Sequence, residues 1–236
     1  MEVIAPKAAM RRWSRACRRA EETVALVPTM GYLHEGHLSL VKQAKRRADR
    51  VVVSIYVNPT QFAHHEDFAE YPRDTERDLN ALRDLGVDAC FLPSELYVDG
   101  QSPDTWVIPG TLAAPLCGAS RPTFFRGVST VVSKLFHIVE PDLAVFGEKD
   151  FQQLRVIQRM VMDLDMSVEI IPMPIVREEG GLAMSSRNAR LSAEARQQAL
   201  VLPRCLSHMT DVVQQGQRDV TTLRREAIEA LESAGA

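Results

Sequence analysis

The stretch VALVPTMGYLHEGHLSLVKQAKRRADRVVVSIYV, residues 24–57, decides the fold class. It opens with a short apolar run at residues 24–28 and closes with a continuous β-branched run at residues 51–57, which is typical of a central parallel strand covered on both faces. Between them, residues 37–47 carry apolar side chains at spacings of three and four, as an amphipathic helix does. A strand, a helix and a second strand in this order predict a parallel pair joined by a right-handed crossover.

The same alternation continues outward from this unit. We predict further strands at residues 87–92, 142–146 and 167–171, and further helices at residues 73–85, 128–139 and 151–164. The fold class is therefore α/β, with a doubly wound, Rossmann-like parallel sheet. After residue 191 only two helical stretches follow, at residues 193–215 and 219–233. We accordingly expect a Rossmann-like domain over residues 1–175 and a small helical domain over residues 176–236.

The composition excludes several classes of protein. Of the 236 residues, 45% are apolar and 25% are charged, which is typical of a globular protein of one to two domains. The formal net charge of −3 argues against a dedicated nucleic-acid binder, and no apolar run approaches the ~18 residues that a membrane helix needs. The four cysteines contain no CxxC pair, so they predict a reducing cytoplasm rather than a disulfide framework or a zinc site.

A basic stretch precedes the first strand of residues 24–57. Its arginines at positions 11, 15, 18 and 19 share one helical face, and Met10, Trp13 and Cys17 share another. We predict a surface helix with a solvated arginine face that covers the sheet. A mitochondrial presequence, which is also basic and amphipathic, is the alternative.

The loop after residues 24–28 carries two histidines, His34 and His37, next to Gly31 and Gly36. Ligands of doubly wound sheets bind at the carboxyl ends of the strands, and glycines let the backbone approach a ligand closely. A helix that begins near His37 directs its free N–H groups and dipole at the same place, so the loop predicts an anion site. Both imidazoles would stabilise charge on a phosphate. A zinc pair or ordinary surface histidines are the alternatives.

Other loops at strand ends add polar groups. Asn58 and Gln61 donate and accept hydrogen bonds, which suits a substrate with hydroxyl and carboxylate groups. Gly147 and Lys149 follow the strand at residues 142–146, and lysine supplies a point charge for phosphate oxygens. The loop HHED at residues 64–67 holds adjacent metal-binding residue types in a polar segment, and we predict no metal site there.

The last loop, residues 176–188, contains a pair of glycines followed by MSSRN. The glycines allow a mobile hinge, and Ser185, Ser186 and Arg187 supply two hydroxyls and a guanidinium that can enclose phosphates. The residues alone thus predict a triphosphate clamp built from several loops.

These motifs resemble a known family. HEGH at residues 34–37 resembles the HxGH signature of the nucleotidyltransferase superfamily. The longer strings VPTMGYLHEGHLSLV, VNPTQF, YPR, FGEKDFQQL and MSSRN, spread from about residue 24 to residue 191, resemble the motifs of the pantoate–β-alanine ligase (pantothenate synthetase) family. The resemblance implies an ATP-dependent condensation of D-pantoate with β-alanine through a pantoyl adenylate, with release of AMP and pyrophosphate. It further implies Mg²⁺ with the ATP, and a homodimer.

Residue chemistry and resemblance together assign the site. Catalytic roles are expected for His34, His37, Lys149, Ser185, Ser186 and Arg187. Substrate contacts are expected for Asn58, Gln61 and Gln153. Contacts with ATP are expected for Met30, Gly31, His34, Gly36, His37, Gly147, Glu148, Lys149, Asp150, Val176, Met184, Ser185, Ser186 and Arg187. The family usually gives His37 an acid–base role, but a phosphate-stabilising role fits the chemistry equally well because the attacking carboxylate is already ionised near neutral pH.

Two positions and the C-terminal region depart from the family pattern. Phe124 stands where the family has histidine in RPxHFxGV, and Cys117 stands where glutamate is frequent. The family usually continues with a mixed domain of helices and a sheet, whereas we expect a shortened helical domain here. Alternatives are therefore a form that binds ATP and pantoate with little turnover, and another HxGH adenylyltransferase that ignores β-alanine.

Overall fold

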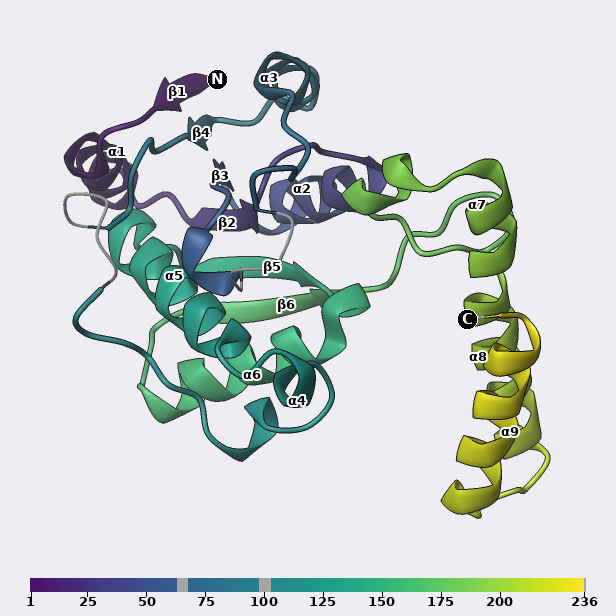
Figure 1. Ribbon diagram of the computed structural model, residues 1–236. Helices are drawn as coiled ribbons and strands as arrows, with labels where there is room; N and C mark the ends of the chain where they lie inside the picture. Colours follow the sequence, from purple (N-terminus) through teal and green to yellow (C-terminus); the bar gives the residue numbers. More distant parts are fainter. Residues whose placement is uncertain (63–67, 98–102, 236) are drawn as a thin grey trace. The chain divides into compact units, whose positions relative to one another are not determined.

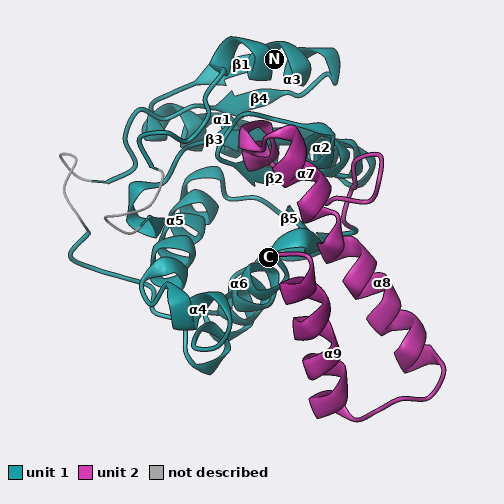
Figure 2. Cartoon of the chain, turned by 45° about the vertical axis from the view of Figure 1, so that its right-hand side comes forward, with its two compact units in different colours: residues 1–174 teal, residues 175–236 magenta. Residues whose placement is uncertain are grey.

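The computed structural model describes residues 1–62, 68–97 and 103–235. The chain divides into two compact units, Met1–Pro174 and Ile175–Ala236, which Figure 2 colours separately. We describe each unit by itself.

The first unit is built on a six-stranded sheet with the order β1-β4-β3-β2-β5-β6, in which every pair is parallel (Figure 1). The strands are β1 (Glu2–Ile4), β2 (Val24–Thr29), β3 (Arg50–Ile55), β4 (Ala89–Phe91), β5 (Leu143–Gly147) and β6 (Glu169–Met173). The predicted doubly wound parallel sheet is confirmed. Because β2 lies between β3 and β5, the loops that follow these three strands emerge side by side at one edge of the sheet.

Helices cover both faces of this sheet. On one face pack α1 (Lys7–Arg19), α5 (Phe124–Val139) and α6 (Phe151–Asp163), and on the other pack α2 (Glu35–Arg47) and α3 (Thr75–Asp84). Alternate residues of β2 enter the two cores, because Leu26 faces α5 while Val27 faces α2. Burial on both faces explains why these strands are continuous apolar runs in the sequence.

The structure also shows what periodicity did not predict. The edge strand β1 has only three residues, two of them exposed, and is defined mainly by its pairing with β4. Helix α5 begins at Phe124 rather than at residue 128, so Gly127 lies inside the helix instead of before it. Short helical turns occupy several loops: η1 (Pro59–Gln61), η3 (Thr111–Ala113), α4 (Cys117–Ser120) and η4 (Glu148–Asp150).

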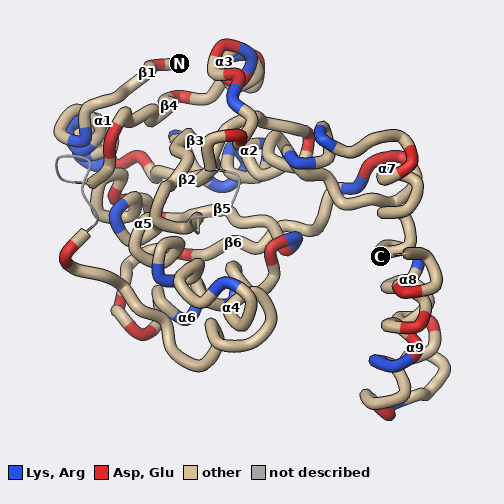
Figure 3. Tube along the Cα trace, in the orientation of Figure 1, with Lys and Arg blue, Asp and Glu red and all other residues tan. Residues whose placement is uncertain are grey.

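The basic face of α1 lies on the surface, as predicted, and Figure 3 shows its cluster of basic residues in blue. Two of its arginines are paired rather than only solvated. Arg15 and Arg18 lie 3.2 and 3.1 Å from the two carboxylate oxygens of Glu140, the residue that ends α5. Met10 and Cys17, on the opposite side of α1, are buried in the core.

The second unit contains η5 (Ser186–Arg190), α7 (Ala193–Ala199), α8 (Val201–Gln214) and α9 (Val220–Ser233). The stretch expected as one helix at residues 193–215 is two helices, α7 and α8, divided at Leu200. Pro203 lies in the first turn of α8, where its missing N–H is tolerated. Among the described residues after Arg187 the structure contains helices and no strand, as we expected. Within the same described ranges, no helix is both long and apolar enough to cross a membrane.

Candidate active site

The turn between β2 and α2 has an unusual backbone. Gly31 has a φ of 83°, and Tyr32 has a φ of 51°, a left-handed conformation that residues with a side chain rarely adopt. A Cβ atom at Gly31 would lie 3.0 Å from Cγ2 of Ile55 and 3.1 Å from Oδ2 of Asp78. The turn is therefore packed tightly against its surroundings, and its first position requires glycine.

Side chains of the protein accept hydrogen bonds from the N–H groups of this turn. The Gly31 N–H donates to Oγ1 of Thr29 over 3.2 Å, and the N–H groups of Tyr32 and Leu33 donate to the two carboxylate oxygens of Asp78 over 2.6 and 2.7 Å. Burial raises the pKa of the Asp78 carboxyl, and these hydrogen bonds act in the opposite direction. The glycines of the loop predict a close approach of the backbone to a ligand, whereas these three N–H groups are already bonded within the chain.

His34 and His37 form a capping box at the start of α2. The Nδ1 atom of His34 accepts from the Gly36 N–H over 3.1 Å, and Nδ1 of His37 accepts from the His34 N–H over 3.3 Å. The two ring centroids lie 4.0 Å apart. Because Nδ1 accepts a hydrogen bond in both rings, each neutral imidazole carries its proton on Nε2. The loop thus presents two Nε2–H donors from neighbouring rings.

His37 is neutral at physiological pH. Burial is the main cause that lowers the pKa of its imidazole to about 3, and the nearby His34 and Lys149 act in the same direction. The charge of Lys149 therefore lies close enough to act on the pKa of His37, and the convergence of Lys149 with both histidines on one phosphate stays a prediction.

Lys149 lies just after the end of one of the inner strands of the sheet. It belongs to η4, directly after β5, and β5 pairs with β2 through Ala25 opposite Leu143. Its ammonium group lies 3.7 Å from Oδ2 of Asp150 and is partly exposed. The neighbouring Gly147 has open space where a Cβ would be, so the backbone there is accessible.

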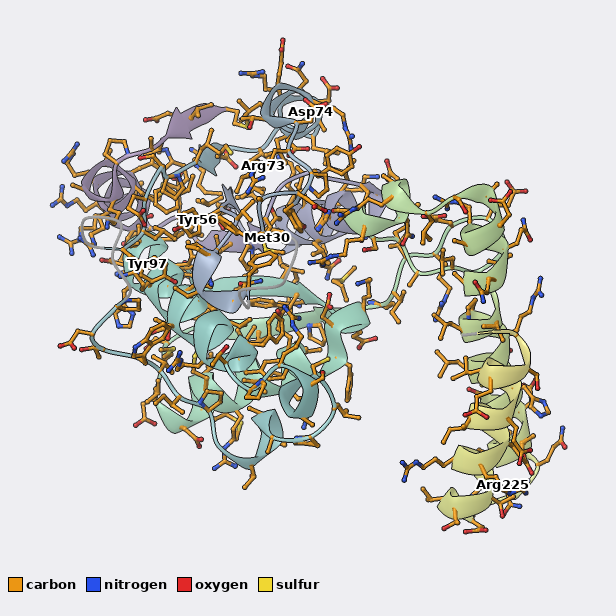
Figure 4. All side chains as sticks on the ribbon, in the orientation of Figure 1. Met30, Tyr56, Arg73, Asp74, Tyr97 and Arg225 are labelled. Atoms are coloured by element: carbon orange, nitrogen blue, oxygen red, sulfur yellow. The ribbon has the colours of Figure 1, made fainter. Side chains whose placement is uncertain are left out.

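A network of hydrogen bonds holds the side chain of Gln61, which lies in the loop after β3. Asn58 is 1% exposed, and its Nδ2 donates to Oε1 of Gln61 over 3.1 Å and to the Gly127 carbonyl over 3.2 Å. Its Oδ1 accepts from the Tyr97 hydroxyl over 2.7 Å. Gln61 in turn donates from Nε2 to the sulfur of Met30 over 3.3 Å (Met30 and Tyr97 are labelled in Figure 4). Asn58 therefore orients Gln61 from inside the protein, a role that a loop sequence alone does not distinguish from substrate contact.

The Asn58–Gly127 contact depends on a very close approach of two backbones. A Cβ at Gly127 would lie 2.3 Å from the carbonyl oxygen of Thr60 and 2.8 Å from the backbone nitrogen of Gln61. Glycine inside α5 thus allows η1, which carries Gln61, to lie directly on the helix.

Arg121 and Phe124 support the same loop. The Nη2 atom of Arg121 donates to the backbone carbonyl of Gln61 over 3.1 Å, and its guanidinium carbon lies 3.9 Å from the centre of the Phe124 ring. From the sequence alone Phe124 has no predicted polar role, because it replaces a histidine of the family pattern. In the structure it is a stacking surface for Arg121.

Gln153 and Gln152 lie in the first turn of α6, close after Lys149. Gln153 is partly exposed there, as a substrate-binding residue must be. Gln152 instead binds a neighbouring loop, because its side chain donates to the carbonyls of Leu112 and Pro115 over 3.0 and 2.7 Å and accepts from the Cys117 N–H over 3.1 Å. Cys117 is exposed, and its backbone is tied to α6.

In the second unit, Ser185 caps η5 by accepting from the Arg187 N–H over 3.3 Å, and Ser186 is buried. Gly180 and Gly181 have φ angles of 93° and 94°, a conformation that favours glycine, and the mobile hinge expected at this pair stays a prediction. Asn188 donates to Glu178 over 2.7 Å, and Glu178 forms an ion pair with Arg196. Val176 and Met184 are partly exposed.

Across the described ranges 1–62, 68–97 and 103–235, no three His, Cys, Asp or Glu side chains are grouped as ligands of a metal ion. The HHED loop at residues 64–67 lies outside the described residues, so the prediction made for it stays a prediction.

A doubly wound parallel sheet with an HxGH pair after its central strand and a lysine after the adjacent strand defines a Rossmann-like enzyme of the HxGH type. The family model "Pantoate-beta-alanine ligase" matches residues 2–236, and the chain belongs to this family.

Curated proteins of this family are similar in sequence to the chain over nearly its whole length. It is 54% identical to the pantothenate synthetase of Heliobacterium modesticaldum over 224 residues, which are 94% of this chain and 79% of the relative. It is 49% identical to the pantoate--beta-alanine ligase of Oryza sativa subsp. japonica over 259 residues, with 99% and 83% covered.

Solved structures agree as well. A pantothenate synthetase from Thermus thermophilus superposes with a TM-score of 0.91 at 49% identity, with 99% of this chain and 83% of that chain covered. A pantoate-beta-alanine ligase from Francisella tularensis, described as complexed with beta-gamma ATP and beta-alanine, gives a TM-score of 0.81 at 33% identity, with 98% and 86% covered. The protein is accordingly a ligase of pantothenate biosynthesis that condenses pantoate with β-alanine in an ATP-dependent reaction.

Proposed function

We propose that the reaction proceeds through a pantoyl adenylate formed beside His34, His37 and Lys149. A carboxylate oxygen of pantoate attacks the α-phosphorus of ATP, and pyrophosphate leaves with the electrons of the broken P–O bond. The amine of β-alanine, after losing a proton, then attacks the activated carbonyl carbon, and AMP leaves. The observation that carries this proposal is that Nδ1 of each histidine accepts a backbone N–H, together with the charge of Lys149 that acts on His37.

His37 acts as a hydrogen-bond donor rather than as a base. Its Nδ1 is occupied by the His34 N–H, and its Nε2 carries the proton of the neutral ring. The attacking carboxylate needs no base, because it is ionised at neutral pH. Both imidazoles therefore stabilise negative charge that develops on the phosphate oxygens, and Lys149 adds a full positive charge.

Gln61 and Gln153 orient pantoate, and Asn58 acts through Gln61. The Gln61 amide is fixed at both ends, by Asn58 and by Met30, so it offers its remaining hydrogen-bonding capacity in one orientation. This arrangement suits a substrate with hydroxyl and carboxylate groups.

The expected contacts with ATP extend over both units. In the first unit they involve Met30, Gly31, Gly36, Gly147, Glu148 and Asp150. In the second unit Ser185, Ser186 and Arg187, with Val176 and Met184, remain predicted ATP contacts, and the first three of them a predicted phosphate clamp. We propose nucleotide and pantoate binding for residues 1–175, and a separate C-terminal domain that begins with the loop carrying MSSRN for residues 176–236.

Mg²⁺ fits this donor set as an ion that arrives with ATP. The described residues offer no dedicated carboxylate cage, and Mg²⁺ commonly keeps several waters while it bridges phosphate oxygens. It would neutralise charge on the triphosphate. We further propose a homodimer in the cytoplasm, and the scattered free cysteines suit a reducing compartment.

The test uses pantoate labelled with ¹⁸O in its carboxylate. Attack of that oxygen on the α-phosphorus followed by aminolysis leaves one ¹⁸O in the phosphate of AMP, which mass spectrometry detects. Pyrophosphate release in a single turnover without β-alanine is also expected. Unlabelled AMP, or pyrophosphate release that requires β-alanine, would contradict the adenylate. Use of another acceptor in place of pantoate would favour the alternative HxGH adenylyltransferase.

A further inference from the structure

Two neighbouring side chains of α3, Arg77 and Asp78, bind the turn that leads to His34. Asp78 accepts the N–H groups of Tyr32 and Leu33 with its two carboxylate oxygens, over 2.6 and 2.7 Å. Arg77 donates from Nη2 to the carbonyl oxygen of Leu33. Its guanidinium carbon also lies 4.6 Å from the centre of the Tyr32 ring. Side chains of helix α3 thus contact both the backbone of this turn and the side chain of Tyr32.

The turn needs such support because of its backbone. Gly31 and Tyr32 both have positive φ angles, and for Tyr32 this conformation is unfavourable. Successive N–H groups in a turn of this kind point toward a common centre, where an anion is usually bound. Here the centre is filled by the carboxylate of Asp78, a residue that is 1% exposed. An apolar side chain at position 78 would leave the two buried N–H groups without acceptors.

The turn is directly continuous with the histidine pair. Leu33 precedes His34, and the His34 N–H donates to Nδ1 of His37. A change in the Tyr32–Leu33 backbone therefore moves the peptide that carries this N–H, and with it the orientation of both rings. Neither Arg77 nor Asp78 lies in the loop itself, since Arg77 is 44 residues from Leu33 in sequence and Asp78 is 45.

We propose that Arg77 and Asp78 are positioning residues of the ligase reaction, which hold the Gly31–Leu33 turn and so set where His34 and His37 present their Nε2–H donors. This inference rests on the proposed function of the two histidines. Arg77 and Asp78 touch no reacting atom in this scheme. They act on the rate of the adenylate-forming step through the histidines.

The test compares Arg77→Gln and Asp78→Asn with Arg83→Gln. Arg83 is an exposed arginine of the same helix whose guanidinium bonds Asn80 on α3 itself, over 2.7 Å, so it serves as the matched control. Asp78→Asn keeps the shape of the side chain but replaces one of the two acceptors by a donor. Arg77→Gln removes the stacking on Tyr32 while leaving the buried Asp78 carboxylate in place, so we expect this variant to fold.

We expect both variants to lower the single-turnover rate of pantoyl adenylate formation by about tenfold or more, the scale of a small misplacement of catalytic groups. The pantoate KM should change less than the rate, because Gln61 and Asn58 keep their network. Arg83→Gln should have the rate of the unmodified protein.

A second readout does not depend on activity. Long-range ¹H–¹⁵N spectra of the free protein report which imidazole nitrogen carries the proton and which accepts a hydrogen bond. We expect the Nδ1 resonances of His34 and His37 to shift in Arg77→Gln and Asp78→Asn, and to stay in place in Arg83→Gln. If Asp78→Asn does not fold, Arg77→Gln alone decides.

Unchanged imidazole spectra in a folded Arg77→Gln variant would overturn the proposal, and so would a rate loss without a spectral change. Failure of the proposed function is recognised separately, because the unmodified protein would then form no pantoyl adenylate. The spectra of the variants would still report whether α3 positions the two rings.

Discussion

The backbone N–H of His34 donates to Nδ1 of His37 over 3.3 Å, and this hydrogen bond decides which nitrogen of His37 is left for a ligand. That nitrogen is Nε2, which carries a proton in the neutral ring. A histidine in this state can donate to a phosphate oxygen, but it has no lone pair available to remove a proton. The geometry of the loop therefore supports the phosphate-stabilising role that we propose for His37 over the acid–base role.

The first prediction concerns this Nε2–H donor. We expect His37→Ala to slow pantoyl adenylate formation by roughly 10²–10³-fold, the range for loss of one donor to a developing oxyanion. His37→Gln should recover part of the rate, because its side-chain amide can place an N–H near the position of Nε2. Single-turnover quench measurements check both variants. An unaltered rate in His37→Ala would exclude the role.

The second prediction is a pH dependence of stability. The pKa of His37 is lowered to about 3 in the folded protein, whereas an unfolded histidine titrates near its ordinary value of about 6.5. Between pH values of about 6.5 and 3, His37 is protonated in the unfolded chain but not in the folded chain. The free energy of unfolding therefore falls as the pH drops through this range. Above it, this group contributes no pH dependence.

Urea denaturation at a series of pH values measures this effect. The slope of unfolding free energy against pH in the acid range should be smaller in His37→Gln than in the unmodified protein, because the variant lacks the titrating group. Equal slopes in the two proteins would mean that His37 is protonated in the folded state near its ordinary pKa.

The third prediction concerns recognition of pantoate. Gln61→Ala should raise the pantoate KM by about tenfold, the effect of losing a hydrogen bond of about 1.4 kcal/mol, while the ATP KM changes little. Gln158→Ala is the matched control, since that glutamine accepts from Arg155 on α6 and belongs to no predicted site. Steady-state kinetics with each substrate varied in turn decide the matter, and an unchanged pantoate KM and kcat would reject the assignment.

The fourth prediction uses the close contact at Gly127. Gly127→Ala should displace η1 from α5, because its Cβ would lie 2.3 Å from the Thr60 carbonyl oxygen, and it should weaken pantoate use together with stability. Ser129→Ala on the same helix is the control. The Ser129 hydroxyl is buried and finds no hydrogen-bond partner among the described residues, so its removal should leave the melting temperature equal or higher.

A crystal structure of Gly127→Ala would show whether Gln61 has moved. If the variant kept both its melting temperature and its pantoate KM, the close approach of the two backbones would be unimportant for the site.

Much of this architecture follows from local sequence. The runs that became β2 and β3 are apolar throughout because both faces of the sheet are covered, and such runs are visible without any structure. The placement of the His34–His37 loop and the Lys149 loop after neighbouring strands could also be predicted, since adjacent parallel strands end on the same side of the sheet. By contrast, β1 is too short to show a pattern and depends on its partner β4.

Contacts between distant segments could not be predicted in the same way. Nothing in the sequence of α3 indicates that Asp78 faces a turn 45 residues earlier, because a buried carboxylate and a solvated one look alike in a polar helix. For the same reason the loop sequence predicts a substrate contact for Asn58 and gives no sign that its amide bonds Gly127 and Tyr97 inside the protein. The direction of a side chain decides its role as much as its type does, and direction is set by the fold.

The pairing of β2 with β5, through Ala25 opposite Leu143, has a consequence for synthesis of the chain. The ribosome releases β2, α2 and β3 long before β5 exists, so the strand at the centre of the finished sheet spends part of translation as an open edge. The histidine turn can form in that interval, but its lysine cannot yet have been made. Contacts of ATP with both the histidine turn and Lys149, as we propose them, therefore become possible only after residue 149 has been made.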